Sequence, residues 1–338
     1  MNNNEKNCIL LTTNFKNNDF KLFSSKSVLI TGGAGFLGSW MCEYLLENNA
    51  KVFCLDDLST GLIDNIKGMK NEKNFIFLKK DVTKNFKINE KIDYIFHMAS
   101  RPGPEDYIQY PLKTLDANSI GTKKVLELAR KNDSILLYAS TSEVYGDAKV
   151  IPTQEDYWGY VNPIGIRSCY DEGKRFSEAL LMAYHRQYGL DIKIVRIFNT
   201  YGPRIRSDGS YGRALSRFVQ QALQNKNITI YGDGLQTRSF CYVTDTVNAI
   251  LKCALNKKTT AMPINIGNPN EITIKKLAAL IIKKTNSKSR MIFLKRPEDD
   301  PQRRCPNINQ AKKILNWKPE ISLDDGLDKI IAWMKERI

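Results

Sequence analysis

A glycine-rich turn near the start of the chain constrains its fold more than any other feature. The apolar run at residues 27–31 predicts a buried β-strand, glycines follow at positions 32, 35 and 38, and residues 39–47 predict a helix. Glycines at these positions permit a tight turn and let backbone amides at the start of the helix approach a pyrophosphate. The segment therefore predicts a dinucleotide-binding turn.

An acidic residue in register with this turn indicates which dinucleotide binds. The predicted strand at residues 51–55 ends at Asp56, eighteen positions beyond Gly38 (56 − 38). A carboxylate there accepts hydrogen bonds from an adenosine ribose and repels a 2′-phosphate, so Asp56 favours NAD. The alternative, a glycine-rich surface turn, does not explain why strand, helix and acid are all in register.

A tyrosine that precedes a lysine by one helical turn is the second informative feature. Tyr170 and Lys174 lie in a predicted helix at residues 169–188, so their side chains share one face. An ammonium group at that distance can lower the pKa of the phenol and make it a proton acceptor near neutral pH. The spacing also arises by chance in amphipathic helices, so alone it is weak support for alcohol oxidation.

Small polar side chains follow the predicted strand at residues 135–139. In the functional interpretation, Thr141 hydrogen-bonds the reacting hydroxyl beside Tyr170, while Glu143 acts on the neighbouring carbon or on a water. The alternative is a Ser/Thr-rich turn that only closes the strand. The downstream tyrosine and lysine favour the functional interpretation.

Alternating strand and helix patterns predict an α/β fold, a doubly wound parallel Rossmann sheet with right-handed crossovers. After about residue 201 this alternation fades, which predicts a smaller, discontinuous C-terminal substrate-binding lobe. The expected division is an extension at 1–24, an NAD-binding domain at 25–200 and a lobe at 201–338 that returns some segments to the domain. Further strands are expected at 75–78, 94–98, 192–197 and 228–231, and helices at 114–131 (with Leu115, Val125, Leu126 and Leu128 on one buried face), 212–224, 274–284 and 323–337.

Composition excludes several classes of protein. The 338 residues, 42% of them hydrophobic, can bury a large core, and no apolar run approaches the roughly 20 residues that span a bilayer. The first 24 residues lack the apolar core of a signal peptide, so a cytoplasmic protein without a membrane partner is expected.

The seven scattered cysteines indicate reduced thiols, and His97 and His185 are too isolated for a metal site. The charge of +15 is spread along the chain, which favours anionic small molecules over nucleic acid.

Several longer strings of residues resemble one known family. The chain resembles the extended short-chain dehydrogenase/reductases, also called the NAD-dependent epimerase/dehydratase family, and within it the UDP-glucuronate decarboxylases, or UDP-xylose synthases. The similarity runs from about Lys26 to the C-terminus. It is carried by the strings 32–38, 140–146, 155–159, 162–175, 196–204, 236–238 and 299–301.

This resemblance implies a lyase with tightly bound NAD. Tyr170, beside Lys174, takes the proton of the sugar 4-hydroxyl while a hydride passes to NAD. The resulting 4-ketone lets the C6 carboxylate leave as CO₂, with Thr141 stabilising the oxyanion and Glu143 and Arg238 around C5. The hydride then returns, so the reaction is redox-neutral and NAD stays bound.

The resemblance also implies the binding residues. Arg213, Arg238, Arg303 and Arg304 lie in glycine- or proline-bounded loops that suit a diphosphate. By resemblance, Asn199 contacts the sugar or diphosphate, Arg213 the phosphates, Tyr231 and Gln236 the uridine side, and Arg304 the distal edge, with Lys113, Thr141, Ser142, Glu143, Tyr170 and Arg238 completing the UDP-sugar site. The implied cofactor residues are Gly32, Gly35, Phe36, Leu37, Gly38, Asp56, Asp57, Thr60, Gly61, Asp81, Val82, Ala99, Ser100, Thr114, Tyr170, Lys174 and Thr200.

Alternatives to decarboxylation differ at single positions. The 4,6-dehydratases carry an aspartate where this chain has Ser142, since loss of water needs a general acid, and 4-epimerases generally lack the carboxylate of Glu143. Ser142 could also be a simple strand-end cap. A non-catalytic NAD sensor is the remaining alternative, which Tyr170, Lys174 and Thr141 disfavour.

Two departures from the family pattern concern the sugar. The segment 97–107 introduces an arginine and two acids where the family often has small residues and prolines, and Asn307 replaces a usual aspartate. Relatives also imply a homodimer joined through the helices containing Val125 and Phe176.

Overall fold

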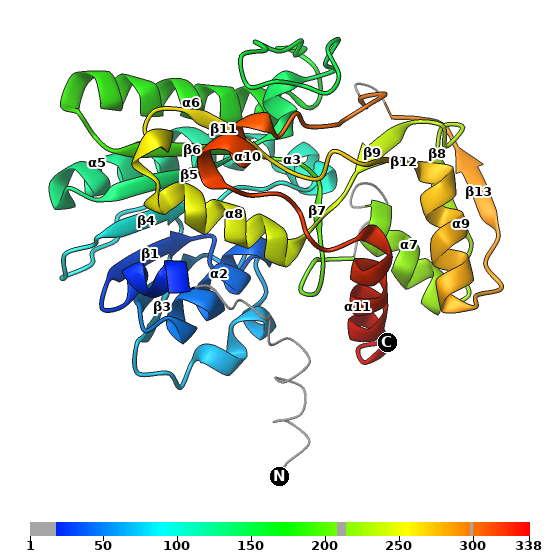
Figure 1. Cartoon of the computed structure of the whole chain (residues 1–338), viewed down its shortest axis with the longest axis horizontal. Coiled ribbons are helices and arrows are strands. Elements are labelled where there is room, and N and C mark those ends of the chain that lie inside the picture. The colour runs from blue at the N-terminus through cyan, green and yellow to red at the C-terminus, as the bar shows by residue number, and fades with distance from the viewer. Residues whose placement is uncertain (1–17, 208–213, 298–299) are drawn as a thin grey trace.

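The computed structural model describes residues 18–207, 214–297 and 300–338. Its centre is a seven-stranded sheet in which every neighbouring pair is parallel, in the order β11-β6-β5-β4-β1-β2-β3 (Figure 1). This order confirms the expected doubly wound α/β fold. The strands are β1 (Ser27–Thr31), β2 (Lys51–Asp56), β3 (Phe75–Lys79), β4 (Tyr94–His97), β5 (Ile135–Thr141), β6 (Ile192–Ile197) and β11 (Pro263–Ile266).

Two helical layers cover the faces of this sheet. Helices α2 (Phe36–Glu47) and α8 (Val243–Leu255) pack with Val28 and Ile30 of β1 in one apolar core. Helices α5 (Thr122–Asn132) and α6 (Ser168–Tyr188) pack with Leu29 of the same strand in the other. Because both faces are buried, the strands read as nearly continuous apolar runs.

The helix expected at residues 114–131 is interrupted. The chain forms α4 (Pro111–Asp116), a π-helical turn η4 (Ala117–Gly121) and then α5. Val125 and Leu126 are fully buried as expected, but Leu115 is exposed, so the prediction of one shared buried face is wrong there. The wider π turn adds a residue to the helical repeat and rotates α4 relative to α5.

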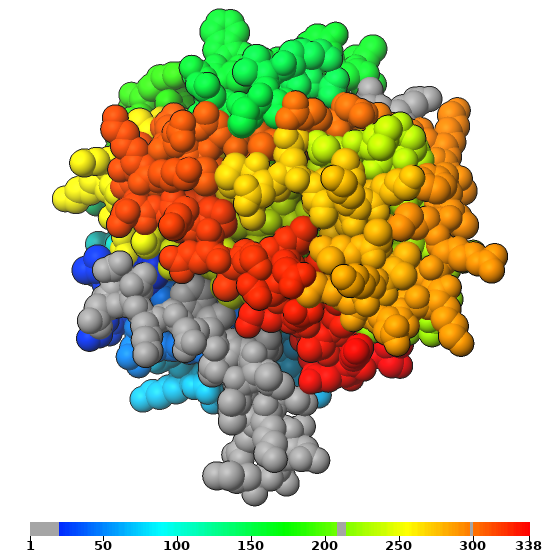
Figure 2. Space-filling model, turned by 45° about the vertical axis from the view of Figure 1, so that its right-hand side comes forward, coloured from blue at the N-terminus to red at the C-terminus, as the bar shows by residue number. Residues whose placement is uncertain are grey.

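Smaller elements gather beside the sheet, on the right of Figure 1. Short sheets pair β8 (Ile228–Tyr231) with β13 (Met291–Leu294), β9 (Thr237–Ser239) with β12 (Glu271–Thr273), and β7 (Thr200–Tyr201) with β10 (Cys241–Tyr242). Figure 2 shows part of the C-terminal segment, coloured orange to red, on the surface between the green middle part of the chain at the top and the blue N-terminal part below. The remaining helices are α3 (Pro104–Gln109), α7 (Ala214–Leu223), α9 (Ile274–Thr285), α10 (Asn309–Leu315) and α11 (Leu323–Lys335), with 3₁₀ turns η1 (Asn18–Phe23), η2 (Ile63–Asn65), η3 (Lys67–Met69), η5 (Ser142–Tyr145) and η6 (Lys257–Thr259).

Cysteines and membrane segments can be assessed over the part of the chain that the structure describes. Its six cysteines are buried free thiols. No helix in those residues is long and apolar enough to cross a bilayer, and they contain no cluster of three or more potential metal-ligating side chains.

Candidate active site

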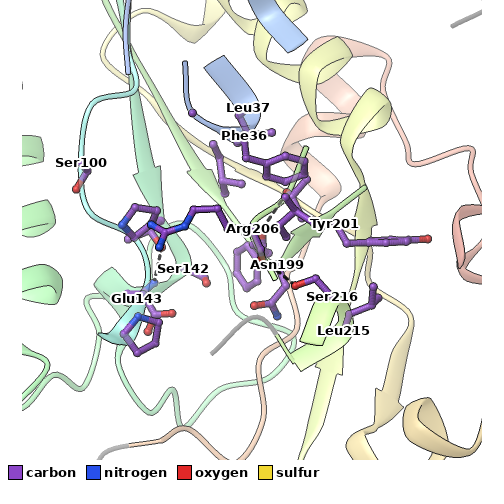
Figure 3. Close-up of a pocket in the computed structure, with 18 of the residues that line it drawn as sticks. Phe36, Leu37, Ser100, Ser142, Glu143, Asn199, Tyr201, Arg206, Leu215 and Ser216 are labelled. Atoms are coloured by element: carbon purple, nitrogen blue, oxygen red, sulfur yellow. Dashed lines mark hydrogen bonds between the residues drawn. The ribbon is translucent and has the colours of Figure 1, made fainter. Parts of the chain in front are cut away.

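A cleft of about 400 Å³ opens at the carboxyl ends of the central strands, where doubly wound sheets hold ligands. The main sheet lines one side, and β7, α7, β8 and β9 line the other. In Figure 3, Phe36 and Leu37 lie at one end of the cleft, Ser142 and Glu143 at the other, and Asn199 on the side of Leu215 and Ser216. Its size suits a small-molecule site.

The glycine turn forms a cradle that side chains would fill. Gly32 has φ +70°, and a Cβ atom there would lie 2.9 Å from the backbone of Ala99. A Cβ atom on Gly38 would lie 2.1 Å from the Gly32 carbonyl oxygen. Helix α2 begins directly after Gly35, and no side chain caps it. A bare helix N-terminus against a glycine turn fits a pyrophosphate.

Asp56 lies on the cleft wall at the end of β2 and is buried. Its carboxylate accepts hydrogen bonds from the amides of Ala34 (3.0 Å) and Leu58 (2.8 Å). Burial raises the pKa of Asp56, although these two amides act in the opposite direction. A Cβ atom on Gly61 would lie 2.8 Å from the carboxylate oxygens, so glycine is needed beside them. This arrangement fits a ribose, and with the glycine cradle it fits NAD.

The other expected cofactor residues divide into two groups. Phe36, Leu37, Thr60, Ser100 and Thr200 line the cleft with the residues described above. Six expected residues are absent from the lining: Asp57, Gly61, Asp81, Val82, Ala99 and Thr114. The side chains of three of them make hydrogen bonds to residues nearby in the sequence. Asp57 accepts from Ser59, Asp81 accepts from Thr83, and the fully buried Thr114 donates to the Tyr110 carbonyl.

Tyr170 and Lys174 lie on the buried face of α6, as the spacing predicts. Tyr170 and Thr141, at the end of β5, both line the cleft, and the Thr141 hydroxyl acts to lower the pKa of the phenol. Lys174 donates through Nζ to the Ala139 carbonyl (2.8 Å), and this nitrogen lies 5.8 Å from the centre of the Tyr170 ring. The strand end and the helix therefore bring together the expected hydroxyl, phenol and ammonium.

The expected lowering of the phenol pKa is not seen. Burial raises the pKa of Tyr170, and the negative charge of Glu143 raises it further. Burial also lowers the pKa of Lys174 to about 7. The expectation considered the pair alone and left out the loss of solvent around both groups.

Glu143 is the centre of a buried ion-pair cluster. Arg167 donates through Nη2 to Oε2 (2.6 Å), and Arg304 reaches both carboxylate oxygens (2.6 and 2.7 Å). All three side chains are at most 13% exposed. Burial raises the pKa of Glu143, but the charges of Arg304 and Arg167 outweigh it, so the net pKa is lowered and the carboxylate stays ionised.

Three arginines line the cleft beside Glu143. Arg304, expected at the distal edge, pairs with the Glu143 carboxylate. Arg167 was not singled out, although it stands within the string 162–175. Arg238 lines the cleft, but its guanidinium is held by Asp300 (both Nη2–Oδ distances 3.1 Å).

Tyr107 is a second residue that the sequence interpretation missed. Its ring stacks on Tyr170, with centroids 5.2 Å apart and planes 8° from parallel. The guanidinium of Arg167 lies 5.8 Å from the centre of the Tyr107 ring. Tyr107 belongs to the segment 97–107, which departs from the family pattern. The signal that could have found it is an aromatic residue inside a segment already expected near the sugar.

The remaining expected substrate residues are placed as follows. Ser142, Asn199, Tyr231 and Gln236 line the cleft, whereas Lys113 is exposed, lies over the Tyr110 ring and does not line it. Arg213 lies outside the described residues.

Both histidines occupy structural positions. The His97 ring makes hydrogen bonds with the Thr31 and Thr122 hydroxyls, and burial lowers its pKa to about 3. The His185 ring bonds the Leu190 carbonyl at the end of α6.

Comparison with known proteins agrees with this geometry. The sequence profile described as the NAD dependent epimerase/dehydratase family matches residues 28–267. UDP-glucuronic acid decarboxylase 1 of Xenopus tropicalis is 44% identical over 93% of this chain and 73% of the relative. UDP-glucuronic acid decarboxylase 5 of Arabidopsis thaliana is 44% identical over 90% of this chain and 88% of the relative. Among solved structures, UDP-glucuronic acid 4-epimerase from Bacillus cereus, in complex with UDP-glucuronic acid and NAD, has a TM-score of 0.83 at 29% identity, covering 92% of this chain and all of that one.

Proposed function

The chain belongs to the NAD dependent epimerase/dehydratase family, and from this premise we propose that it is an NAD-dependent carboxy-lyase that converts UDP-glucuronate to UDP-xylose. The observation that carries the proposal is the pair of arginines around Glu143, next to Tyr170. One carboxylate and two guanidinium groups leave a net charge of +1. A buried site of that charge suits a ligand that brings one carboxylate.

The first part of the reaction follows from Tyr170, Thr141 and Lys174. NAD, when held by the glycine cradle and Asp56, would supply the hydride acceptor and donor for C4 of the sugar. Tyr170 accepts the proton of the 4-hydroxyl, and we assign Thr141 a hydrogen bond to the same oxygen, since both residues line the cleft. A hydrogen bond to the Ala139 carbonyl holds the Lys174 ammonium near the phenol. In this position its positive charge stabilises the phenolate form of Tyr170.

The carboxylate is lost once C4 is a ketone. The electrons of the C5–C6 bond delocalise onto the C4 oxygen as CO₂ leaves, and Tyr170 and Thr141 donate hydrogen bonds to the negative charge that develops there. Loss of CO₂ from a carboxylate consumes one proton, which adds to C5. Glu143, Arg304 and Arg238 are the groups we assign to the surroundings of C5.

Ser142 distinguishes decarboxylation from dehydration. It stands at the cleft directly before Glu143 and has no acidic group that could protonate a departing hydroxyl. CO₂ leaves without an acid. Serine at this position therefore supports the proposed reaction over the loss of water.

The division of labour between the two parts of the chain is part of the proposal. We assign the cofactor to residues 25–200 and the nucleotide-sugar mostly to 201–338, with β11 returning to the main sheet beside β6. The lining residues Asn199, Tyr231 and Gln236 support a UDP site on the outer side. A cytoplasmic location fits the buried free thiols.

We also propose a homodimer formed through α4, η4 and α6. Leu112 (74% exposed), Ile120 and Phe176 present apolar side chains there, while Val125 of α5 is buried within the chain. Sedimentation of the wild-type protein and of Phe176→Glu tests the dimer. A monomeric wild-type protein contradicts it.

Incubation with UDP-glucuronate tests the function. The proposal expects release of CO₂ and formation of UDP-xylose. A product of unchanged mass indicates a 4-epimerase instead. Bound NAD without any conversion indicates a sensor.

A further inference from the structure

Asp171 is a buried acid that the proposed reaction leaves without a role. It follows Tyr170 on α6, and its side chain is 9% exposed. Among the described residues, its Oδ1 atom has no hydrogen-bond partner. Its Oδ2 atom lies 3.8 Å from Nε of Arg167, which is longer than a hydrogen bond. An ionised carboxylate is poorly stabilised in this position.

The charges around Asp171 explain its state. Arg167, the cation nearest to Asp171, is already bound to Glu143. Burial and the charge of Glu143 raise the pKa of Asp171 to about 8, although the charges of Arg167 and Arg304 act in the opposite direction. On α6 itself, Lys174 donates to the Ala139 carbonyl and Arg175 pairs with Glu172, so neither supplies a counter-ion to Asp171. Of the other elements that pack against α6, α3 and α4 carry Glu105, Asp106 (paired with Arg206) and the exposed Lys113 and Asp116, and η5 carries Glu143. Helix α5 carries Lys123, Lys124 and the pair Glu127–Arg130, and β6 carries Lys193 and Arg196, which pair with Asp191 and Glu178.

We propose that Asp171 is a positioning residue that acts in its neutral form. It packs against Arg167 without neutralising it, so that Arg167 and Arg304 can bind the sugar carboxylate while they stay paired with Glu143. The inference rests on the proposed function and adds the residue that sets the charge of the carboxylate site. Arg167 connects the two acids: its Nη2 atom bonds Glu143, and its Nε atom faces Asp171.

The charge balance gives the consequence. With Asp171 neutral, the carboxylate of Glu143 and the two arginines sum to +1, which matches one incoming carboxylate. With Asp171 ionised, the sum is zero. Because the site is buried and poorly screened by salt, loss of one unit charge several ångströms away should weaken carboxylate binding about tenfold.

The test compares two ligands that differ in the carboxylate. The KM for UDP-glucuronate and the inhibition constant of UDP-xylose are measured for the wild-type protein from about pH 6.5 to 9.5. We expect KM to rise about tenfold through pH 8. The inhibition constant should change far less, because UDP-xylose has the same nucleotide but no carboxylate.

Two variants assign the effect to one residue. Asp171→Asn is neutral at every pH and should lose the alkaline rise in KM. Glu172→Gln changes the neighbouring acid, which pairs with Arg175 and not with Arg167, and should keep the rise.

The outcomes separate this inference from the proposed function. A parallel change of KM and the inhibition constant, or a rise that survives in Asp171→Asn, overturns the role of Asp171 while decarboxylation stands. A wild-type protein that releases no CO₂ overturns both. If Asp171→Asn does not fold, the comparison of the two ligands in the wild-type protein decides.

Discussion

Replacement of Glu143 by glutamine is the sharpest perturbation of the site, because it removes one negative charge and almost no volume. Arg167 and Arg304, which are 8% and 10% exposed, then keep their positive charges without a counter-ion. Removing one partner of a buried ion pair costs about 3–5 kcal/mol of unfolding free energy. For 338 residues the unfolding entropy is about 0.7 kcal/mol/K. The variant should therefore unfold about 4–7 °C below the wild-type protein.

The pH dependence of this difference follows from the direction of the pKa shift. The folded protein holds the pKa of Glu143 below its ordinary value, so the stabilisation is present above that value and is lost as the pH falls through the folded pKa. Calorimetry at pH 7 should show the full difference in Tm between the wild-type protein and Glu143→Gln. The difference should shrink under acidic conditions.

Activity gives a second readout of Glu143→Gln. Turnover of UDP-glucuronate should fall about a hundredfold or more, because the carboxylate beside C5 is lost. The KM should not rise, since both arginines stay available to the sugar carboxylate. Glu90→Gln, which breaks the exposed pair with Lys51, is the control and should change Tm by less than about 1 °C. The reasoning is refuted if Glu143→Gln matches this control in Tm, or if only its KM changes.

Three further predictions concern the cofactor, the base and acid stability. Tyr170→Phe should reduce turnover at least about a thousandfold while bound NAD, measured after denaturation, stays at the wild-type level; near-normal turnover would rule out Tyr170 as the base. Asp56→Ala should lose NAD during purification with an unchanged circular dichroism spectrum, whereas Asp64→Ala, which changes an exposed acid outside the cleft lining, should keep it; equal retention in both contradicts the ribose contact. The pKa of His97 is lowered to about 3 from its ordinary 6.5, so the unfolded chain takes up a proton that the folded protein does not, and stability should fall from pH 6.5 toward 3. The unfolding free energy measured in urea should depend less on pH in His97→Gln than in the wild-type protein. Equal pH dependence in the two proteins would exclude His97 as the cause of the acid destabilisation.

Local patterns in the sequence predict much of the fold. The glycine turn, the buried strands and the spacing of Tyr170 and Lys174 each depend on residues that are close in the chain. The π turn η4 was missed because nothing in the apolar spacing distinguishes it from an α-helical turn. It is the reason why Leu115 and Val125 do not share a face.

Contacts between distant segments limit what can be predicted of the site. Arg304 is 161 positions from Glu143, and only the return of the C-terminal segment to the cleft brings them together. Tyr107 reaches Tyr170 from another element in the same way. Both pKa shifts of the Tyr170–Lys174 pair depend on burial, which the spacing of the two residues does not contain.

The stoichiometry of a single reaction tests the central claim most directly. Purified protein, with the NAD it retains and none added, is given UDP-glucuronate, and CO₂, the nucleotide-sugar and NADH are measured together. We predict equal amounts of CO₂ and UDP-xylose over many turnovers with no net NADH. Conversion of UDP-glucuronate to its 4-epimer without CO₂, or no conversion by protein that contains NAD, would contradict the claim.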